Sequence, residues 1–264
     1  MKNLHKCIFD PLTLDDLDRC GPALLQPEAR NYFTGVSGRG ITYKENKKAY
    51  RRIKIVPKVM KGISNTELKT NVLKRPVDFP IGLSSVGLQK LAHPSGELAT
   101  AAGVSDLRTV MIVSSYSSTL IEDMAPIIRS SATIFWMQLY MFENHEITRD
   151  IIARAERAGF KAFVLTVDTP VHPTLTCNAG KRVHDLGVSL ANLPDGKEPA
   201  LDSSLFPYYI TSVTRQTKLP VIAKGIYTVQ DAREAAYAGA SAILVSNHGG
   251  RQVDGTPAAV SRNN

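Results

Sequence analysis

The chain has 264 residues, of which 43% are hydrophobic and 21% charged, a composition typical of globular domains. No apolar run approaches the ~20 residues of a membrane helix, and the N-terminus is too polar for a signal peptide. The net charge of +8 fits a basic surface or a site for anionic ligands. Because the basic residues are dispersed and carry no recognisable binding motif, neither a nucleic-acid partner nor a membrane is expected.

The first 75 residues indicate helices and irregular structure, and Cys7, Cys20 and Cys177 have no paired spacing, so no disulfide framework is expected. From residue 76 onward, apolar segments alternate with amphipathic ones. The predicted strands span residues 77–85, 109–115, 133–140, 161–168, 220–225 and 241–247. The predicted helices span residues 96–107, 118–128, 146–159, 204–217 and 228–239. Residues 169–200 look irregular. We therefore divide the chain into an N-terminal helical extension, 1–75, and a larger part, 76–264.

Six near-continuous apolar strands joined by five helices predict an α/β fold with a parallel sheet covered by helices. An open doubly wound sheet and a barrel are the two alternatives. No G-x-G-x-x-G follows the first strand, which disfavours dinucleotide binding. Polar residues gather at the carboxyl ends of the strands, where a (β/α)8 TIM barrel builds its active site. They are Ser84, Ser85, Ser114, Ser115, Gln138, Tyr140, Thr166, Asp168, Lys224, Asn247 and His248. We predict a barrel with six of its eight strand–helix units.

Three segments resemble one family of enzymes. "QLYMFENHEITRDIIARAERAGFKAFVLTVDTP", "LPVIAKGI" and "SNHGGRQVDGTPA" are similar to the FMN-dependent 2-hydroxy acid oxidases and dehydrogenases, and the resemblance covers nearly the whole chain. It implies an FMN-linked TIM barrel that oxidises an (S)-2-hydroxy acid to a 2-oxo acid. Oxygen is the expected electron acceptor and hydrogen peroxide the product. Full-length relatives are expected to be homo-oligomeric, and no metal site is expected.

The oxidation needs a base that works near neutral pH, and histidine is the natural choice. His248 matches the family's catalytic base, and Asp168 matches the aspartate that supports the protonated ring. Each alone is more often structural, a strand-end histidine and a turn aspartate. Arg251, three residues after His248, favours the functional interpretation, because it matches the arginine that binds the substrate carboxylate.

The resemblance also assigns substrate and cofactor contacts. Tyr32 and Tyr140 match the two tyrosines that contact substrate, and Tyr140 also belongs to the predicted catalytic group. Lys224 matches the lysine beside the flavin pyrimidine edge, where a cation stabilises the reduced ring. The other predicted cofactor contacts are Ser85, Val86, Gly87, Ser114, Gln138 and Thr166. Taken singly, each polar side chain in this group could simply face water at the end of a strand.

The sequence departs from the family pattern at several places. The triplet from Ser85 to Gly87 stands where relatives often have Pro-Thr-Ala, and Tyr116 stands where glycolate oxidase-like members have tryptophan. Leu175 falls at the place of a second substrate arginine, which Lys181 and Arg182, further along, need not replace.

The resemblance implies two further strands after residue 258, whose loops hold the FMN phosphate. The chain ends first, so we expect a C-terminally truncated sequence with little bound flavin. No Ser-Lys-Leu signal ends it, and the expected location is peroxisomal by analogy or cytoplasmic. The alternative function is a truncated, inactive relative with at most a binding role. An isopentenyl isomerase-like FMN barrel is a third option, which does not explain His248 with Arg251.

Overall fold

The computed structural model describes residues 11–62, 64–172, 175, 186–204 and 206–262. A parallel five-stranded sheet forms the centre, with its strands in sequence order. The strands are β3 (Val110–Val113), β4 (Ile134–Leu139), β5 (Phe163–Thr166), β6 (Val221–Ile226) and β7 (Ala242–Val245). The expectation of one parallel sheet in sequence order, the barrel arrangement, is confirmed.

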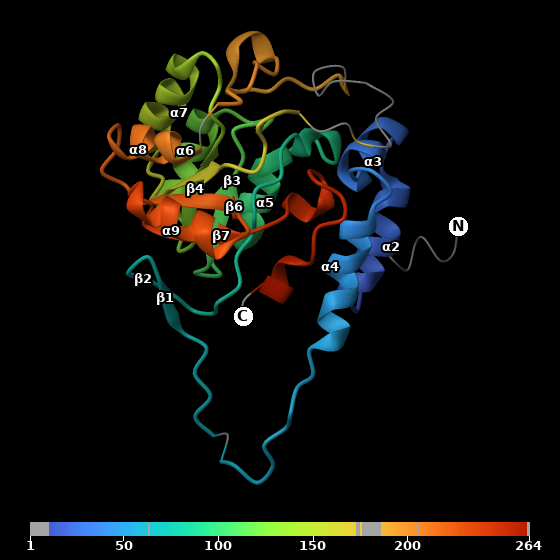
Figure 1. The fold of residues 1–264 in the computed structure, drawn as a ribbon. Coiled ribbons are helices and arrows are strands. Elements are labelled where there is room, and N and C mark those ends of the chain that lie inside the picture. Colours follow the sequence, from blue (N-terminus) through green and yellow to red (C-terminus); the bar gives the residue numbers. More distant parts are fainter. Residues whose placement is uncertain (1–10, 63, 173–174, 176–185, 205, 263–264) are drawn as a thin grey trace.

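Helices connect these strands and cover one face of the sheet, as Figure 1 shows. They are α5 (Gly96–Val104), α6 (Ile121–Ser130), α7 (His145–Ala158), α8 (Phe206–Thr214) and α9 (Val229–Tyr237). The predicted helices agree with them to within a few residues at each end. The start and end of α7 follow from local chemistry, because the Asn144 side chain accepts from Glu146 N and Gly159 adopts φ +107°.

The predicted first strand at 77–85 is wrong in its extent. Only Leu83 makes a bridge to β3, through Leu83 N to Val110 O at 2.8 Å and Ile112 N to Leu83 O at 2.9 Å. Pro76 and Pro80 lack the N–H groups that a ladder needs. A short antiparallel hairpin instead contains β1 (Thr70–Val72) and β2 (Arg75–Val77).

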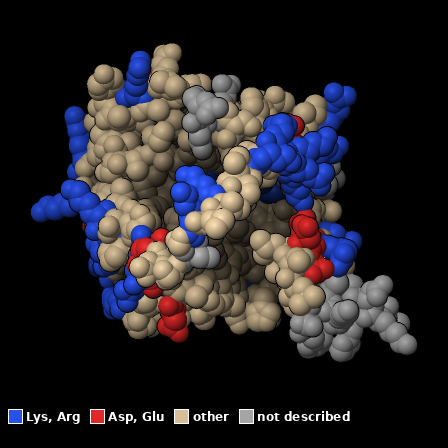
Figure 2. Space-filling view, turned by 90° about the horizontal axis from the view of Figure 1, so that it is seen from below, with Lys and Arg blue, Asp and Glu red and all other residues tan. Residues whose placement is uncertain are grey.

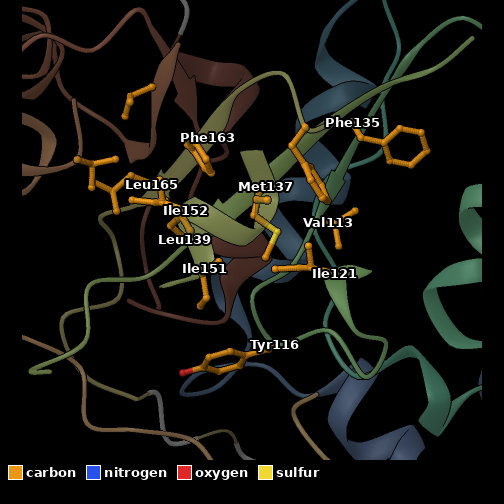
Figure 3. Close-up of a cluster of buried hydrophobic side chains, with 14 of the residues drawn as sticks. Val113, Tyr116, Ile121, Phe135, Met137, Leu139, Ile151, Ile152, Phe163 and Leu165 are labelled. Atoms are coloured by element: carbon orange, nitrogen blue, oxygen red, sulfur yellow. The ribbon is translucent and has the colours of Figure 1, made fainter. Parts of the chain in front are cut away.

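The two faces of the sheet differ because strand side chains alternate. The face towards the helices packs a large cluster that includes Met137, Phe163 and Leu165, and Figure 3 shows these side chains together with Tyr116 at their margin. The other, concave face carries a second apolar cluster that includes Ile112, Trp136 and Val164. Two residues further along each strand, the concave face becomes polar, and this is where the site lies.

The N-terminal segment contains α2 (Leu14–Leu24), α3 (Pro27–Thr34) and α4 (Ile41–Arg52). These helices stand at one side of the molecule, and the residues after β7 run between α4 and the sheet (Figure 1). Cys20 is buried and disulfide-bonded, so the expectation of no disulfide is wrong for this residue. The division at residue 75 stays a prediction. Cys7, Cys177, Lys181 and Arg182 lie outside the described residues.

Two surface features bear on partners. Among the described residues, no helix is long and apolar enough to cross a membrane. Seen from below, lysine and arginine side chains form several separate groups rather than one continuous patch (Figure 2).

Candidate active site

A polar ladder crosses four neighbouring strands on the concave face. Gln138 Oε1 accepts from Ser114 Oγ at 3.3 Å and from Ser115 N at 3.1 Å, while Gln138 Nε2 donates to Thr166 Oγ1 at 2.9 Å. Thr166 is the register partner of Lys224 on β6. Parallel strands bring their carboxyl ends to one edge, so residues more than a hundred positions apart become neighbours.

A cavity of about 300 Å³ lies against this ladder, within the usual size of small-molecule sites. Its lining comes from the strand ends, from α3 and from the segment after β7. The lining residues are Tyr32, Phe33, Ser84, Ser85, Val86, Gly87, Ser114, Tyr116, Tyr140, Thr166, Lys224, Ser246, His248, Gly249 and Arg251. Most of the predicted site residues therefore share one cavity. Gln138 lies behind it as the tie between Ser114 and Thr166, and Asp168 reaches it through His248.

His248 and Asp168 form a partly buried acid–base pair. His248 Nδ1 lies 2.9 Å from Asp168 Oδ1, and Thr169 Oγ1 donates to the same carboxylate oxygen at 3.2 Å. Burial lowers the pKa of His248, although the hydrogen bond to Asp168 opposes this. Because the neutral ring uses its Nδ1 proton for Asp168, its Nε2 lone pair is left to accept a proton.

The backbone after β7 adopts an unusual conformation that presents His248. His248, Gly249 and Gly250 have φ of +56°, +67° and +77°, and a positive φ is uncommon for residues other than glycine. A Cβ on Gly250 would lie 2.7 Å from the Tyr43 backbone nitrogen. Only glycine allows this close approach between the turn and α4.

Helix α4 fixes the same turn by hydrogen bonds. The side chains of Asn46 and Asn247 exchange two hydrogen bonds, of 3.0 and 2.8 Å. Asp254 accepts from Arg39 N at 2.8 Å and Thr42 N at 2.9 Å, which caps the start of α4 from the far end of the chain. Helix α4 therefore supports the turn that carries His248, a role that no local sequence signal indicated.

Lys224 places a cation in the buried wall of the cavity. It is 6% exposed, and burial lowers its pKa while Asp168 opposes the shift. A β-bulge separates Lys224 from Ile226, and the bulged Gly225 has φ +102°. A Cβ on Gly225 would lie 2.5 Å from Asp168 Cβ, so this glycine makes room for the aspartate. Burial would raise the pKa of Asp168, but His248 and Lys224 together lower it.

Arg251 and Tyr32 meet at the mouth of the cavity. Arg251 donates from Nη1 to Gly35 O at 2.7 Å, and its guanidinium lies 5.5 Å from the centre of the Tyr32 ring. Guanidinium carries five N–H donors, so others are left for an anion. Leu175, which is buried, lies beside the same place, since a Cβ on Gly35 would be 3.2 Å from Leu175 Cδ1.

Three tyrosines, Tyr32, Tyr116 and Tyr140, line the cavity. The Tyr116 and Tyr140 ring centres are 4.9 Å apart. Burial, together with the charge of Glu198, raises the pKa of Tyr116, Tyr140 and Tyr32, the last to about 12. The Glu198 side chain is 7% exposed and pairs with His172 at 2.9 Å. The three phenols are therefore neutral donors at neutral pH.

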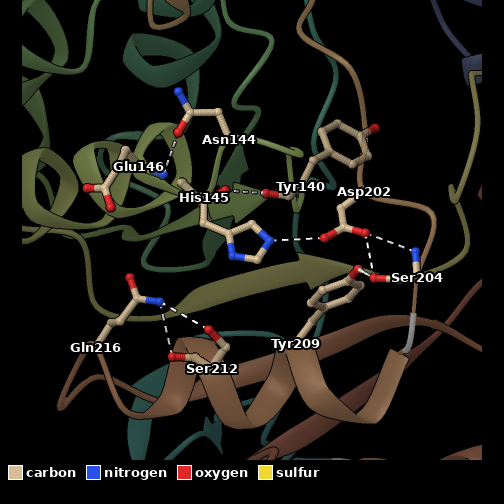
Figure 4. Close-up of polar contacts among 10 residues, drawn as sticks. Tyr140, Asn144, His145, Glu146, Asp202, Ser204, Tyr209, Ser212 and Gln216 are labelled. Carbon is tan, nitrogen blue, oxygen red and sulfur yellow. Dashed lines mark hydrogen bonds and ion pairs between the residues drawn. The ribbon is translucent and has the colours of Figure 1, made fainter.

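A second polar cluster anchors the segment that returns from the irregular region. His145 Nε2 lies 2.9 Å from Asp202 Oδ2, and Ser204 N and Oγ donate to Asp202 Oδ1 (Figure 4). Glu143 N donates to Ala200 O and Asp202 N donates to Met141 O, each at 3.0 Å. These bonds flank the bridge between Phe142 and Leu201. This clamp closes one side of the site beside Tyr140.

The cavity fits a flavin ring on its chemistry. Asp168 Oδ2 is buried without a hydrogen-bond partner in the described part of the chain, which is rare unless a ligand supplies one. A Cβ on Gly87 would lie 3.0 Å from Tyr116, so this wall leaves no room for a side chain. A buried cation, hydroxyls and backbone groups on one wall suit a planar ring that gains negative charge.

Comparisons with known proteins agree with this geometry. Residues 23–262 match the FMN-dependent dehydrogenases. The chain is 34% identical to peroxisomal (S)-2-hydroxyacid oxidase GLO4 of Arabidopsis thaliana, over 95% of this chain and 72% of the relative. It is 31% identical to human 2-hydroxyacid oxidase 1, over 94% of this chain and 72% of the relative.

Solved structures show the same fold. A putative lactate oxidase of Pediococcus acidilactici superposes with a TM-score of 0.88 and 32% identity, over 96% of this chain and 71% of that one. Mandelate oxidase with benzoyl-formic acid superposes with a TM-score of 0.85 and 30% identity, over 95% and 72%. The five parallel strands are thus part of a TIM barrel of the FMN-linked type, and the chain belongs to the FMN-dependent dehydrogenase family.

Proposed function

We propose that the protein oxidises an (S)-2-hydroxy acid to a 2-oxo acid with FMN, and that oxygen takes up the electrons to give hydrogen peroxide. The observation that carries this proposal is the His248–Asp168 pair at 2.9 Å, in a cavity that also presents Arg251. The 2-hydroxy acid oxidases among the relatives support it. An isomerase-like chemistry would not use this combination of base and carboxylate-binding cation.

The base acts on the substrate hydroxyl. The neutral His248 accepts the hydroxyl proton on Nε2, and Asp168 stabilises the resulting imidazolium through Nδ1. Oxidation removes one proton and one hydride equivalent from the substrate, and FMN supplies the hydride acceptor when bound. Lys224 places positive charge at the cavity wall, where it offsets charge that develops on the ring.

Orientation of the substrate falls to Arg251, Tyr32 and Tyr140. The guanidinium of Arg251 binds the substrate carboxylate with the donors that Gly35 O leaves free. Both tyrosines line the cavity and remain protonated, so they donate to the carboxylate or the hydroxyl. Ser85, Val86, Gly87, Ser114 and Thr166 provide the flavin-facing wall, with Gln138 fixing Ser114 and Thr166 from behind.

Location and assembly are part of the same proposal. Two Arabidopsis relatives are named as peroxisomal oxidases, and we extend this location to the present chain. We also propose a homo-oligomer, which rests only on the resemblance to the family.

The decisive experiment mixes the purified protein, saturated with FMN, with a series of (S)-2-hydroxy acids without oxygen. Bleaching of the flavin absorbance near 450 nm, followed by recovery and peroxide formation when oxygen is admitted, is the expected result. His248→Ala should bind FMN equally well and bleach about 10²–10⁴-fold more slowly. A protein that binds FMN but is reduced by no hydroxy acid is instead an inactive relative with a binding role.

A further inference from the structure

Glu97 is a buried carboxylate that the proposed chemistry does not use. It is 0% exposed, in the first turn of α5. Its Oε1 accepts from Gln89 N at 3.1 Å and from Ser118 N at 3.0 Å. Its Oε2 accepts from Ser118 Oγ at 2.9 Å and from Thr119 Oγ1 at 2.7 Å. A buried carboxylate is tolerated only when its oxygens are so satisfied.

The donors come from two different loops. Gln89 follows the segment 84–88 at the end of the incomplete first strand, and Ser118 and Thr119 follow β3. One more bond joins the loops directly, from Lys90 N to Ser118 Oγ at 3.0 Å. The Glu97 carboxylate therefore ties the two loops together, because it accepts hydrogen bonds from both of them in addition to this direct bond.

In each loop, the residues that precede the Glu97 contacts in sequence form part of the cavity wall. Gly87 and Tyr116 line the cavity, and Leu88 N donates to Tyr116 O at 2.9 Å. A Cβ on Gly87 would lie 3.0 Å from both Tyr116 Cβ and Tyr116 O. This contact is so close that a small shift of one loop changes the shape of the wall.

We propose that Glu97 is a positioning residue, which sets the flavin-facing wall by fixing the loop 84–90 against the loop 114–119. The role depends on reach and on accepting capacity rather than on net charge. Glutamine has the same length: its carbonyl can accept from the two backbone N–H groups, and its amide can donate to the two hydroxyls, which rotate. Aspartate keeps the charge but is one methylene shorter and cannot span both loops.

Amide hydrogen exchange tests this without any flavin. We expect Glu97→Asp and Glu97→Ala to raise exchange at least tenfold in the segments 84–91 and 114–120, and Glu97→Gln to stay within threefold of wild type. β4 and β5 should keep their protection. Glu146→Gln is the matched control, because Glu146 is exposed and pairs only locally with Arg149 among the described contacts; it should change neither segment.

Further variants keep the test decisive. If Glu97→Ala does not fold, Glu97→Asp and Thr119→Val are compared with wild type instead. Thr119→Val should raise hydrogen exchange in the segment 114–120 more than in the segment 84–91. The proposal is overturned if Glu97→Asp leaves both segments protected, or if exchange rises equally throughout the chain. It is also overturned if Glu97→Gln loosens both segments as Glu97→Asp does, since the reach that glutamine keeps would then not be enough to hold the loops.

A second readout is the affinity for FMN, measured by quenching of flavin fluorescence, and this part rests on the proposed function. We expect at least a tenfold increase in Kd for Glu97→Asp and less than threefold for Glu97→Gln. If the wild-type protein binds too little FMN to quench its fluorescence, the hydrogen-exchange data decide the positioning role, and the proposed function is judged separately by flavin reduction. Loosened loops with unchanged FMN affinity would show that Glu97 does not shape the flavin wall.

Discussion

His248 Nδ1 lies 2.9 Å from Asp168 Oδ1 across 80 positions of sequence. The two residues come from the ends of β7 and β5, which flank β6, and Gly225 on β6 leaves the space in which Asp168 sits. The pair therefore depends on three strands and one bulge. Separate substitutions can therefore test the His248–Asp168 pair, Lys224 and Gly225.

Asp168→Asn should keep the shape of the site and remove the charge that stabilises the protonated ring. The amide can also offer a donor to Nδ1, which favours the wrong tautomer of His248. We expect flavin reduction by the best hydroxy acid to slow about 10²–10⁴-fold, with FMN affinity within threefold of wild type. Anaerobic stopped-flow absorbance measures the first and fluorescence titration the second. An unchanged rate would remove Asp168 from the mechanism.

Stability should fall on acidification, for two reasons with the same sign. The pKa of His248 is lowered from its ordinary 6.5, so below that pH the unfolded chain takes up a proton that the folded chain does not. The pKa of Asp168 is lowered from its ordinary 3.8, so its contribution is present above 3.8 and lost as the pH falls through the folded value. Stability therefore decreases from pH 7.5 towards pH 5, and further below pH 4.

Urea unfolding at several pH values checks this dependence. His248→Gln should flatten the part between pH 7 and pH 5 and also weaken the part below pH 4, because the hydrogen bond from His248 helps to lower the pKa of Asp168. A curve with the same slope in wild type and variant would mean that other groups cause it.

Much of this site could be predicted from sequence, because it rests on local patterns. The alternation along β3 to β7 and the polar residues at the strand ends placed Tyr140, Thr166, Lys224 and His248 at one edge. The prediction of a strand at 77–85 was wrong in its extent, because an apolar run that contains Pro80 looks like a strand but lacks a backbone N–H that the ladder needs. Positions such as Glu97 carry no such signal, since the partners of a buried carboxylate are identified only by the fold.

Contacts between distant segments could not be predicted from the sequence either. Asp254 caps α4 more than 200 positions away, and a cap is recognisable in sequence only when it lies next to its helix. Gln138 shows the converse. Gln138 was predicted to contact the flavin, whereas in the structure its amide donates to Leu139 O and Thr166 Oγ1 within the ladder.

Lys224→Met should separate stability from function. Methionine has similar length, and burial disfavours the charged form of Lys224, as the direction of its pKa shift indicates. We expect the free energy of unfolding to stay within about 1 kcal/mol of wild type, or to rise, while flavin reduction slows at least tenfold. Chemical denaturation and stopped-flow absorbance measure the two effects. Equal losses in both would indicate a structural role for this lysine. Lys218→Met is the control, because Lys218 is exposed and lies in the loop between α8 and β6.

Gly225→Ala should disturb Asp168 directly. Alanine at φ +102° is strained, and its Cβ would overlap Asp168, so we expect a loss of about 2–4 kcal/mol in the free energy of unfolding. Gly103→Ala is the matched control, because Gly103 lies in α5 with nothing within 4 Å of its added Cβ. That change should stabilise by about 0.5–1 kcal/mol. Similar effects of the two substitutions would contradict the role of the bulge.

Leu175→Arg should strengthen substrate binding if the site lacks a second cation. Leu175 is buried beside Gly35, whose carbonyl holds Arg251, so an arginine here has its guanidinium near the same anion. We expect KM for the best hydroxy acid to fall about tenfold, which corresponds to about 1.4 kcal/mol, with kcat unchanged because the contact serves the ground and transition states alike. Leu175→Met controls for the loss of leucine packing and should leave KM unchanged. An unchanged KM in Leu175→Arg would mean that Arg251, with the neutral tyrosines, already satisfies the carboxylate, and that this enzyme binds its substrate with one arginine.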